Sequence, residues 1–458
     1  MRAGALWLAS FVILPAAGAP LLTHRSYRSL SPAARLVLSG AVGAVLLSFV
    51  MTVLAILGLH WNVPVLAAVA LGLAIVLRLA VPPDSPCPIA PPAISETGER
   101  LAPLLAGAAV AAALAATMAG AAGSTDLLFF WGPKAQAFAS ARTIDASFLA
   151  SPRASHMHPY YPPLVTNLYA FASIAAGRFA WGAATLTFPI LLAALAIALP
   201  SLLRLSERPL APRAVSALVV SALALLGFES EVAGNADPWL LLFETLSLAL
   251  LLAPAPHPPQ RLLLAGLLFA GAASTKVEGL PFVAAAVLFF IAFDGSRSRL
   301  AGRLSLLLAP AAASLGAWFL FGLSRKAFAG YGEYGSLLEL RWDRFGLVLT
   351  TIGRSLWSAG FALSYLVPLA VLLFARGGPR RLPLAVAAAL AAFLAVTYML
   401  PVGDPASWIG WSAARTFSPV AALLALALGA RRGQKKYAMA QSAERPEIQS
   451  PATKDRGQ

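Results

Sequence analysis

Long runs of apolar residues, separated by short polar connections, make up most of the chain. A helix needs about 20 apolar residues to cross the hydrocarbon core of a bilayer, so these runs predict about thirteen membrane-spanning helices. The predicted spans are 5–22, 34–58, 63–80, 101–122, 178–203, 213–229, 238–253, 262–275, 280–293, 303–322, 358–374, 382–400 and 416–430. The pattern therefore predicts an all-α polytopic membrane protein.

Breaks in this pattern predict how the chain is organised. The Pro-rich stretch 82–100 is predicted to be a cytoplasmic linker between an N-terminal three-helix membrane unit (1–81) and a larger transmembrane domain (101–430). The polar tail 431–458 is predicted to be disordered and cytoplasmic. The run 162–176 is apolar enough to be either a further span or a helix lying on the membrane surface.

The overall composition supports the membrane class. Hydrophobic residues make up 59% of the chain and charged residues 12%, and the mean hydropathy is +0.76, which excludes an ordinary soluble protein. The single cysteine, Cys87, excludes an internal disulfide and a cysteine-based metal site.

Basic residues recur in alternate connections and predict the orientation. The connections that share them contain Arg25, Arg28 and Arg35; Arg78 and Arg100; Arg204, Arg208 and Arg213; Arg261; Arg297, Arg299 and Arg303; Arg376, Arg380 and Arg381; and 431–436. The positive-inside rule makes these connections cytoplasmic, with the N-terminus outside and the C-terminus inside a cytoplasmic (inner) membrane. The net charge of +15 is thus explained by membrane lipids, and no nucleic-acid partner is predicted.

The stretch from Ser124 to Leu164 has the richest chemistry. It combines an acid, a lysine, histidines and aromatic residues, and loops of about this length in compact chains are usually functional or disordered. On the extracytoplasmic side it is predicted to form surface-lying helices, divided by its prolines. We expect it to form a cavity with the loop 324–346 and with the spans that end at Asp237 and Lys276.

Further ionisable residues lie at span ends on the same predicted side. They are Asp237 in GNADP, Lys276 and Glu278 in TKVEG, and Arg415 in the loop 401–417. Ionisable groups close to hydrocarbon are costly and therefore indicate function. Glu244 lies inside a span seven residues after Asp237, on roughly the same helix face, so the two are predicted to line one cavity.

The order of these motifs resembles a known family. An acid after a span is followed by W-x-x-K-A, H-P-x-Y-P-P-L, G-N-A-D-P, T-K-x-E-G and an arginine before the last span in SWIGWSAARTFSP. This order is similar to the polytopic GT-C glycosyltransferases that use polyprenyl-phosphate sugars. The nearest subgroup comprises bacterial enzymes related to the protein mannosyltransferases and the aminoarabinose transferase of lipid A. The resemblance covers about residues 100–430 and implies a GT-C-like fold.

The resemblance implies a catalytic acid at Asp126. An inverting transfer needs a carboxylate to take the proton of the acceptor hydroxyl and needs no protein nucleophile. Relatives show two acids close together there, whereas Thr125 and Leu127 flank a single Asp here. Asp237 is the candidate for a second catalytic carboxylate. The alternative for Asp126 is an N-cap of the helix LLFFWGPKAQAF.

The leaving group implied by the resemblance is a lipid phosphate, which needs cations at the membrane surface. Arg415 matches the arginine of relatives, and Lys134 and Lys276 are further candidates. The alternative for Arg415 is a snorkelling side chain. Lys276 has the alternative of pairing with Glu278 or Asp237, and Glu278 is included among the substrate-binding candidates.

Aromatic and imidazole groups complete the candidate site. His158 and Tyr161 are predicted to position donor or acceptor by hydrogen bonding and stacking, although Tyr160 stands where relatives often have an Asp. The pair His156 and His158 leaves a divalent metal open, but further ligands at metal-site spacing are missing, so no metal and no cofactor are predicted. The sequence has no phosphate-binding loop for a nucleotide donor.

The sequence therefore predicts a membrane glycosyltransferase. It would move a sugar from a polyprenyl-phosphate donor to a glycan, lipid or protein acceptor on the extracytoplasmic side. The alternatives are a lipid or glycan transporter or flippase, favoured by mid-membrane ionisable residues such as Glu244, and a non-catalytic membrane assembly protein.

Overall fold

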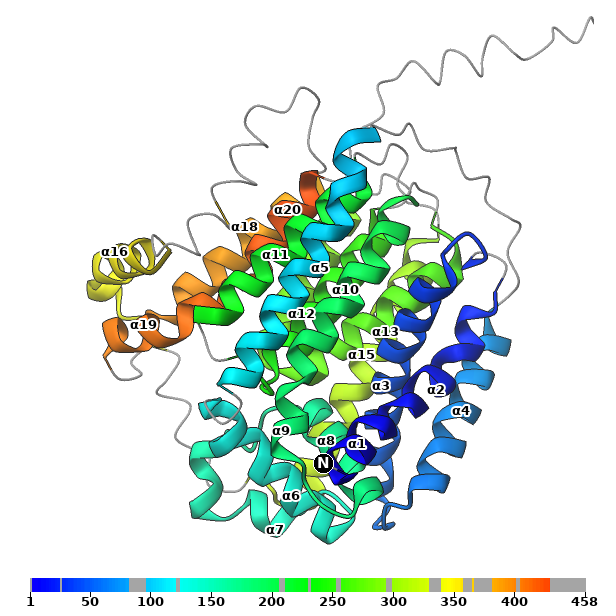
Figure 1. The fold of residues 1–458 in the computed structure, drawn as a ribbon. Helices are drawn as coiled ribbons and strands as arrows, with labels where there is room; N and C mark the ends of the chain where they lie inside the picture. Colours follow the sequence, from blue (N-terminus) through cyan, green and yellow to red (C-terminus); the bar gives the residue numbers. More distant parts are fainter. Residues whose placement is uncertain are drawn as a thin grey trace, which may run out of the picture.

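The described part of the chain is helical throughout (Figure 1). The computed structural model describes residues 2–24, 27–81, 96–120, 124–205, 211–229, 232–252, 257–293, 299–328, 339–356, 365, 381–400 and 404–428. Among these residues no β-strand occurs. The predicted linker 82–100 falls mostly outside the described residues, as do the span 358–374 and the tail 431–458.

The helices follow one another along the chain with short connections. The first are α1 (Arg2–Ala9), η1 (Ser10–Val12), α2 (Ile13–Leu22), α3 (Pro32–Ile56), α4 (Val63–Ala80) and α5 (Glu96–Ala119). Then come η3 (Leu127–Trp131), α6 (Gly132–Ala141), α7 (Ala146–Leu149), η4 (Pro152–Met157), α8 (Leu164–Ala176), α9 (Trp181–Thr185) and α10 (Thr187–Leu203). The rest are α11 (Pro212–Glu229), α12 (Asp237–Leu251), α13 (Pro259–Thr275), α14 (Gly279–Phe293), α15 (Leu300–Ser324), η6 (Trp342–Arg344), α16 (Phe345–Leu356), α18 (Arg381–Thr397), α19 (Pro405–Thr416) and α20 (Ser418–Leu428).

Seven helical segments are long and apolar enough to cross a membrane. They are Arg2–Leu22, Pro32–Ile56, Val63–Ala80, Arg100–Ala119, Trp181–Leu203, Leu300–Ser324 and Pro405–Leu428. Each coincides with a predicted span, which confirms an all-α membrane protein. Helices also form at five further predicted spans, as α11, α12, α13, α14 and α18, but these are shorter or less apolar. The complete set of thirteen spans stays a prediction.

Helices α12 and α13 lie at the centre of the bundle, and α4, α5 and α15 lie toward its outside (Figure 1). Every residue of α12 and α13 is buried, so these two helices contact protein on all sides. In contrast, α4 exposes apolar side chains such as Val76 and Leu79. Apolar residues exposed on a spanning helix are suited to contact with lipid, so α4 presents a lipid-compatible face.

Helix α8 lies inside the protein. Its residues Leu164–Ser173 are buried, and it packs against α1, α3 and α6. The expectation of a surface helix at 162–176 was therefore wrong, because apolar residues around the whole circumference of α8 are covered by neighbouring helices. Hydrogen bonds from Asn167 Nδ2 to the Ser48 carbonyl oxygen (3.2 Å) and from Trp7 Nε1 to Ser173 Oγ (3.3 Å) join α8 to the first helices.

The segment 124–163 folds into η3, α6, α7 and η4, which gather at one end of the bundle (Figure 1). The Trp318 indole of α15 donates a hydrogen bond to the Tyr160 carbonyl oxygen (2.9 Å) and fixes the end of this segment. At Gly132 the ring of Trp181 packs so closely that an added Cβ would lie 2.2 Å from it. A glycine is thus required where η3 meets α6.

The region 401–417 was expected to be a loop before the last span, and this was wrong for its described part. Residues 405–416 form α19, which leads through Phe417 into α20. Asp404 starts α19 by accepting a hydrogen bond from the Ser407 amide (2.8 Å), and Pro405 occupies the first turn. Arg415 therefore lies in the last turn of a helix.

The predicted orientation leads to a labelling experiment in spheroplasts. In a Cys87→Ser background, a cysteine at the exposed Ser147 should react with a membrane-impermeant maleimide in intact spheroplasts. Native Cys87 should react only after the membrane is permeabilised. Labelling of Ser147→Cys only after permeabilisation would reverse the orientation and place the chemistry of the segment 124–163 in the cytoplasm.

Candidate active site

Five buried residues form a chain of alternating charges. Arg415 Nη1 forms an ion pair with Asp126 Oδ2 and lies 3.9 Å from Asp237 Oδ2. Lys276 Nζ lies 2.8 Å from Asp237 Oδ1 and 3.4 Å from Glu278 Oε1. Residues predicted separately from four stretches of sequence are thus brought together in one network, which we call the charged network.

Helix ends position three of these groups. Asp237 is the first residue of α12, where the positive end of the helix dipole favours a carboxylate, and its amide donates a hydrogen bond to Asn235 Oδ1 (3.0 Å). Lys276 follows the last residue of α13, where the negative end favours a cation. Arg415 occupies the last turn of α19 for the same reason. The backbone dipoles thus reinforce each charge.

Asp126 does not act as a helix cap. Its side chain makes no capping hydrogen bond, and Ser124 Oγ instead accepts a hydrogen bond from the Leu127 amide (3.4 Å). The following turn is π-helical, with the Gly132 amide donating to the Leu127 carbonyl oxygen, and Pro133 has no amide hydrogen for the next α-helical bond. The capping alternative was therefore wrong, and the carboxylate of Asp126 is directed to Arg415.

Burial makes the charged network costly to disrupt. Asp126 is 8% exposed, Arg415 9%, and Asp237 and Lys276 4% each. The snorkelling alternative for Arg415 was wrong, because its guanidinium points toward two carboxylates rather than toward bulk water. Removing one partner of a buried pair typically costs about 3–5 kcal/mol, since the other charge stays buried. Burial disfavours the charge of Lys276, but Asp237 and Glu278 outweigh this effect and raise its pKa above the ordinary value.

A cavity of about 470 Å³ opens beside the charged network. Four members of the network line it, namely Asp126, Lys276, Glu278 and Arg415. Aromatic and imidazole rings line the rest: Phe130, Trp131, His158, Tyr161, Tyr398, Trp408 and Trp411. The described residues of the loop 324–346 do not line this cavity, contrary to expectation; the end of α18 and helix α19 occupy that position.

His158 and Tyr161 form a stacked pair in the cavity wall. Their ring centroids lie 4.9 Å apart with an angle of 21° between the planes, and His158 Nδ1 lies 3.2 Å from the Tyr160 hydroxyl. Burial, followed by the charges of Lys134, Lys276 and Arg415, lowers the pKa of His158 to about 4. The imidazole is therefore neutral at pH 7. Burial, reinforced by Glu278 and Asp237, raises the pKa of Tyr161, which stays a hydroxyl.

The described residues contain no group of three or more His, Cys, Asp or Glu side chains arranged to hold a metal ion. His156 is exposed, and the Phe130 ring lies beside both His156 and His158. The arrangement of these two histidines therefore lends no support to a shared metal.

Lys134 is buried behind the cavity wall and does not line the cavity. Its ammonium group lies 4.4 Å from the centroid of the Trp131 ring, a cation–π contact. Burial lowers the pKa of Lys134 to about 7, although the charge of Asp126 opposes this shift. The expected direct contact of Lys134 with a phosphate in the cavity is therefore not supported.

The lowered pKa of Lys134 predicts a pH-dependent stability difference. The unfolded chain binds this proton up to about pH 10.5, whereas the folded protein releases it above about pH 7. Between these values the unfolded state holds more protons, so the destabilising contribution of Lys134 is full below pH 7 and is lost as the pH rises. Lys134→Met should therefore raise the melting temperature most below pH 7, and this gain should shrink toward pH 10.

Melting in detergent, followed by tryptophan fluorescence at several pH values, measures this difference. Lys326→Met, at an exposed position, is the matched control and should run parallel to the wild type. A parallel curve for Lys134→Met would show that Lys134 titrates as an ordinary lysine.

Sequence analysis missed the polar cluster opposite Asp126. The Tyr398 hydroxyl lies 2.8 Å from Ser412 Oγ and 2.9 Å from Thr416 Oγ1, and all three residues line the cavity. Ser412 and Thr416 are four positions apart on one face of α19, close to that of Arg415. This spacing was the available signal, but it required the region to be recognised as a helix.

Comparison with known proteins gives no relatives for this chain. No family model, no curated protein and no solved structure matches it. The resemblance to GT-C glycosyltransferases therefore stays a prediction from the motifs.

Proposed function

We propose that this protein is a membrane glycosyltransferase that moves a sugar from a polyprenyl-phosphate donor to an acceptor on the extracytoplasmic side. The supporting observation is the cavity of about 470 Å³, which places Asp126 and Arg415 side by side next to an aromatic wall. A carboxylate, a fixed cation and stacking rings are the groups that such a transfer needs. The GT-C-like fold with about thirteen spans is part of this proposal.

In the proposed reaction, Asp126 is the base. It takes the proton of the acceptor hydroxyl while the acceptor oxygen bonds to the anomeric carbon of the sugar. The bond from that carbon to the phosphate oxygen breaks, and the oxygen leaves with the electron pair on the lipid phosphate. Attack from the face opposite the leaving group inverts the configuration. Asp237 holds Arg415 and Lys276 in place and stands as the second carboxylate.

The ion pair between Asp126 and Arg415 imposes an order on this reaction. While Arg415 holds Asp126, the carboxylate is a weak base, because the cation stabilises its ionised form. A phosphate that reaches Arg415 competes for the same guanidinium and releases Asp126. The donor therefore binds first and activates the base, and a planar guanidinium with several donors suits this exchange.

The aromatic wall supports a sugar substrate. The stacked His158 and Tyr161 rings present a flat face to the cavity, and Arg415 lies 4.6 Å from the Trp411 ring centroid. Rings of this kind suit the apolar faces of sugar rings, and the neutral imidazole leaves the charge balance of the site unchanged.

The direct test has a cellular and a purified part. Cells with and without the protein are compared for their lipid-linked and envelope glycans, which identifies the sugar that is lost. The purified protein in liposomes is then given the polyprenyl phosphate of that sugar, and transfer is measured by release of the polyprenyl phosphate. Unchanged glycans in cells that lack the protein would contradict the proposal.

A transporter or flippase of lipids or glycans is the second candidate. The observation that favours it is Glu244, a buried carboxyl inside α12, since ionisable groups inside spans often mark transport pathways. Movement of a fluorescent polyprenyl-phosphate sugar across liposomes, without chemical transfer, would favour this function over the first.

A further inference from the structure

Glu244 is a buried carboxyl group without a partner. It lies two helical turns after Asp237 in α12 and is 1% exposed. Neither of its carboxyl oxygens has a hydrogen-bond partner. The glycosyl transfer proposed above gives Glu244 no role, so its retention at this cost needs another explanation.

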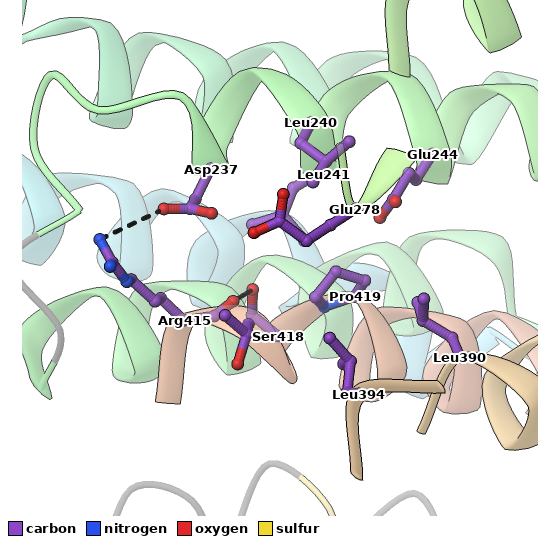
Figure 2. A pocket seen from close by; sticks show the side chains of 11 residues that line it. Asp237, Leu240, Leu241, Glu244, Glu278, Leu390, Leu394, Arg415, Ser418 and Pro419 are labelled. Atoms are coloured by element: carbon purple, nitrogen blue, oxygen red, sulfur yellow. Dashed lines mark hydrogen bonds and ion pairs between the residues drawn. The ribbon is translucent and has the colours of Figure 1, made fainter. Parts of the chain in front are cut away.

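A narrow pocket connects Glu244 with the charged network. The pocket holds about 10 Å³, close to the space of one water molecule, and is lined by Asp237, Glu244, Glu278 and Arg415 among leucines of α12 and α18. Figure 2 shows the carboxyl groups of Asp237, Glu278 and Glu244 along one side, with Arg415 and Pro419 facing them. Glu278 also lines the large cavity, so it borders both spaces.

The nearby charges leave Glu244 uncompensated. The acids Asp126, Asp237 and Glu278 are matched by Arg415, Lys276 and Lys134. The helices that pack against α12 add little: α10, α14 and α20 contain no charged residue, and α13 contains only Arg261, near its opposite end. An ionised Glu244 would thus be a lone negative charge among apolar side chains, which is expensive.

We propose that Glu244 is an inner proton site that exchanges its proton with Glu278 through the narrow pocket. A proton is the cation that fits, because the pocket is too small for a metal with its ligands and the described residues contain no metal-binding cluster. At rest Glu244 holds the proton, and Glu278 is ionised beside Lys276 (3.4 Å).

Exchange would redistribute charge at the large cavity. When the proton moves from Glu244 to Glu278, the negative charge moves from Glu278 to Glu244, and the total charge is unchanged. Lys276 then loses one of its two carboxylate partners and turns a free hydrogen bond toward the cavity. Resting on the proposed function, this exchange makes Lys276 a second cation for the donor phosphate, supplied when the proton shifts.

Infrared spectroscopy tests the proton without using sugar transfer. A protonated carboxyl gives a carbonyl stretch that shifts when the purified protein is moved from H2O to D2O. We expect such a band in the wild type, its loss in Glu244→Gln, and its retention in Thr245→Val, a buried control on the same helix that does not line the pocket. Identical spectra of wild type and Glu244→Gln, or a band that depends on sodium, would overturn the proton site.

A second variant tests the exchange with Glu244 intact and serves if Glu244→Gln does not fold. Glu278→Gln removes a negative charge that opposes ionisation of Glu244, so the Glu244 band should disappear at a lower pH than in the wild type. An unchanged pH would overturn the coupling between the two carboxyls.

The role in transfer has its own readout. The pH profile of transfer should change in Glu244→Gln and stay that of the wild type in Thr245→Val; a profile unchanged by Glu244→Gln would overturn this role. If the wild type transfers no sugar but the infrared result holds, the proposed function fails and the proton site stands.

Discussion

Replacing Asp126 with asparagine is expected to lower the rate of sugar transfer by about a hundred-fold to ten-thousand-fold, the usual cost of losing a general base. The amide keeps the size of the side chain and still accepts a hydrogen bond from Arg415, but it takes no proton. Binding of the donor should be retained or strengthened, because Arg415 is no longer held by a carboxylate. Release of polyprenyl phosphate under saturating donor measures the rate.

The matched control for this variant is Asp145→Asn in the same segment. Asp145 caps α7 by accepting a hydrogen bond from the Phe148 amide (2.9 Å), and it does not line the cavity. Its loss should leave the transfer rate near that of the wild type and cost about 1 kcal/mol of stability at most. Near-normal turnover of Asp126→Asn would remove Asp126 from the mechanism and assign the base to Asp237.

Replacing Arg415 is expected to have the second largest effect, and on donor binding. Arg415→Lys keeps a positive charge but loses the planar set of donors that contacts two carboxylates and would contact a phosphate. Transfer should fall substantially, with a larger rise in KM for donor than for acceptor. Arg415→Ala should show the same selectivity more strongly, and it should also destabilise the protein by about 3–5 kcal/mol, because Asp126 then stays buried without a partner.

Arg354→Ala is the control for the arginine variants. Arg354 is exposed on α16 and does not line the cavity. Its loss should change neither donor KM nor stability by much. Equal donor titrations for Arg354→Ala and folded Arg415→Ala would exclude Arg415 from phosphate binding and leave Lys276 as the cation of the site.

The order of donor and acceptor binding is a consequence of the same ion pair. A site in which Arg415 first holds Asp126 differs from one with a free base, because the acceptor alone finds no active carboxylate. In Asp126→Asn this coupling is absent, so donor affinity should no longer depend on the competition between phosphate and carboxylate. Donor binding measured in the wild type and in this variant separates the two contributions of Asp126.

The sequence by itself determined the class of the protein and the identity of the charged residues. Spans such as Pro32–Ile56 are recognisable because hydrocarbon demands about 20 apolar residues in a row, a local property of the chain. Asp126, Asp237 and Lys276 stood out because charges beside such runs are costly. Neither inference requires knowledge of which helices pack together.

Only the tertiary structure decided which of these residues meet. Asp126 and Arg415 are 289 positions apart, and nothing local in either segment specifies their pairing. The same holds for α8, whose apolar surface suits lipid and protein equally until its neighbours are known. Lys134 shares a helical segment with Asp126, yet it lies behind the cavity wall because the π-helical turn and the Trp131 ring set its direction. Local composition fixes what a side chain is able to do, whereas the packing of distant helices fixes the partner with which it does it.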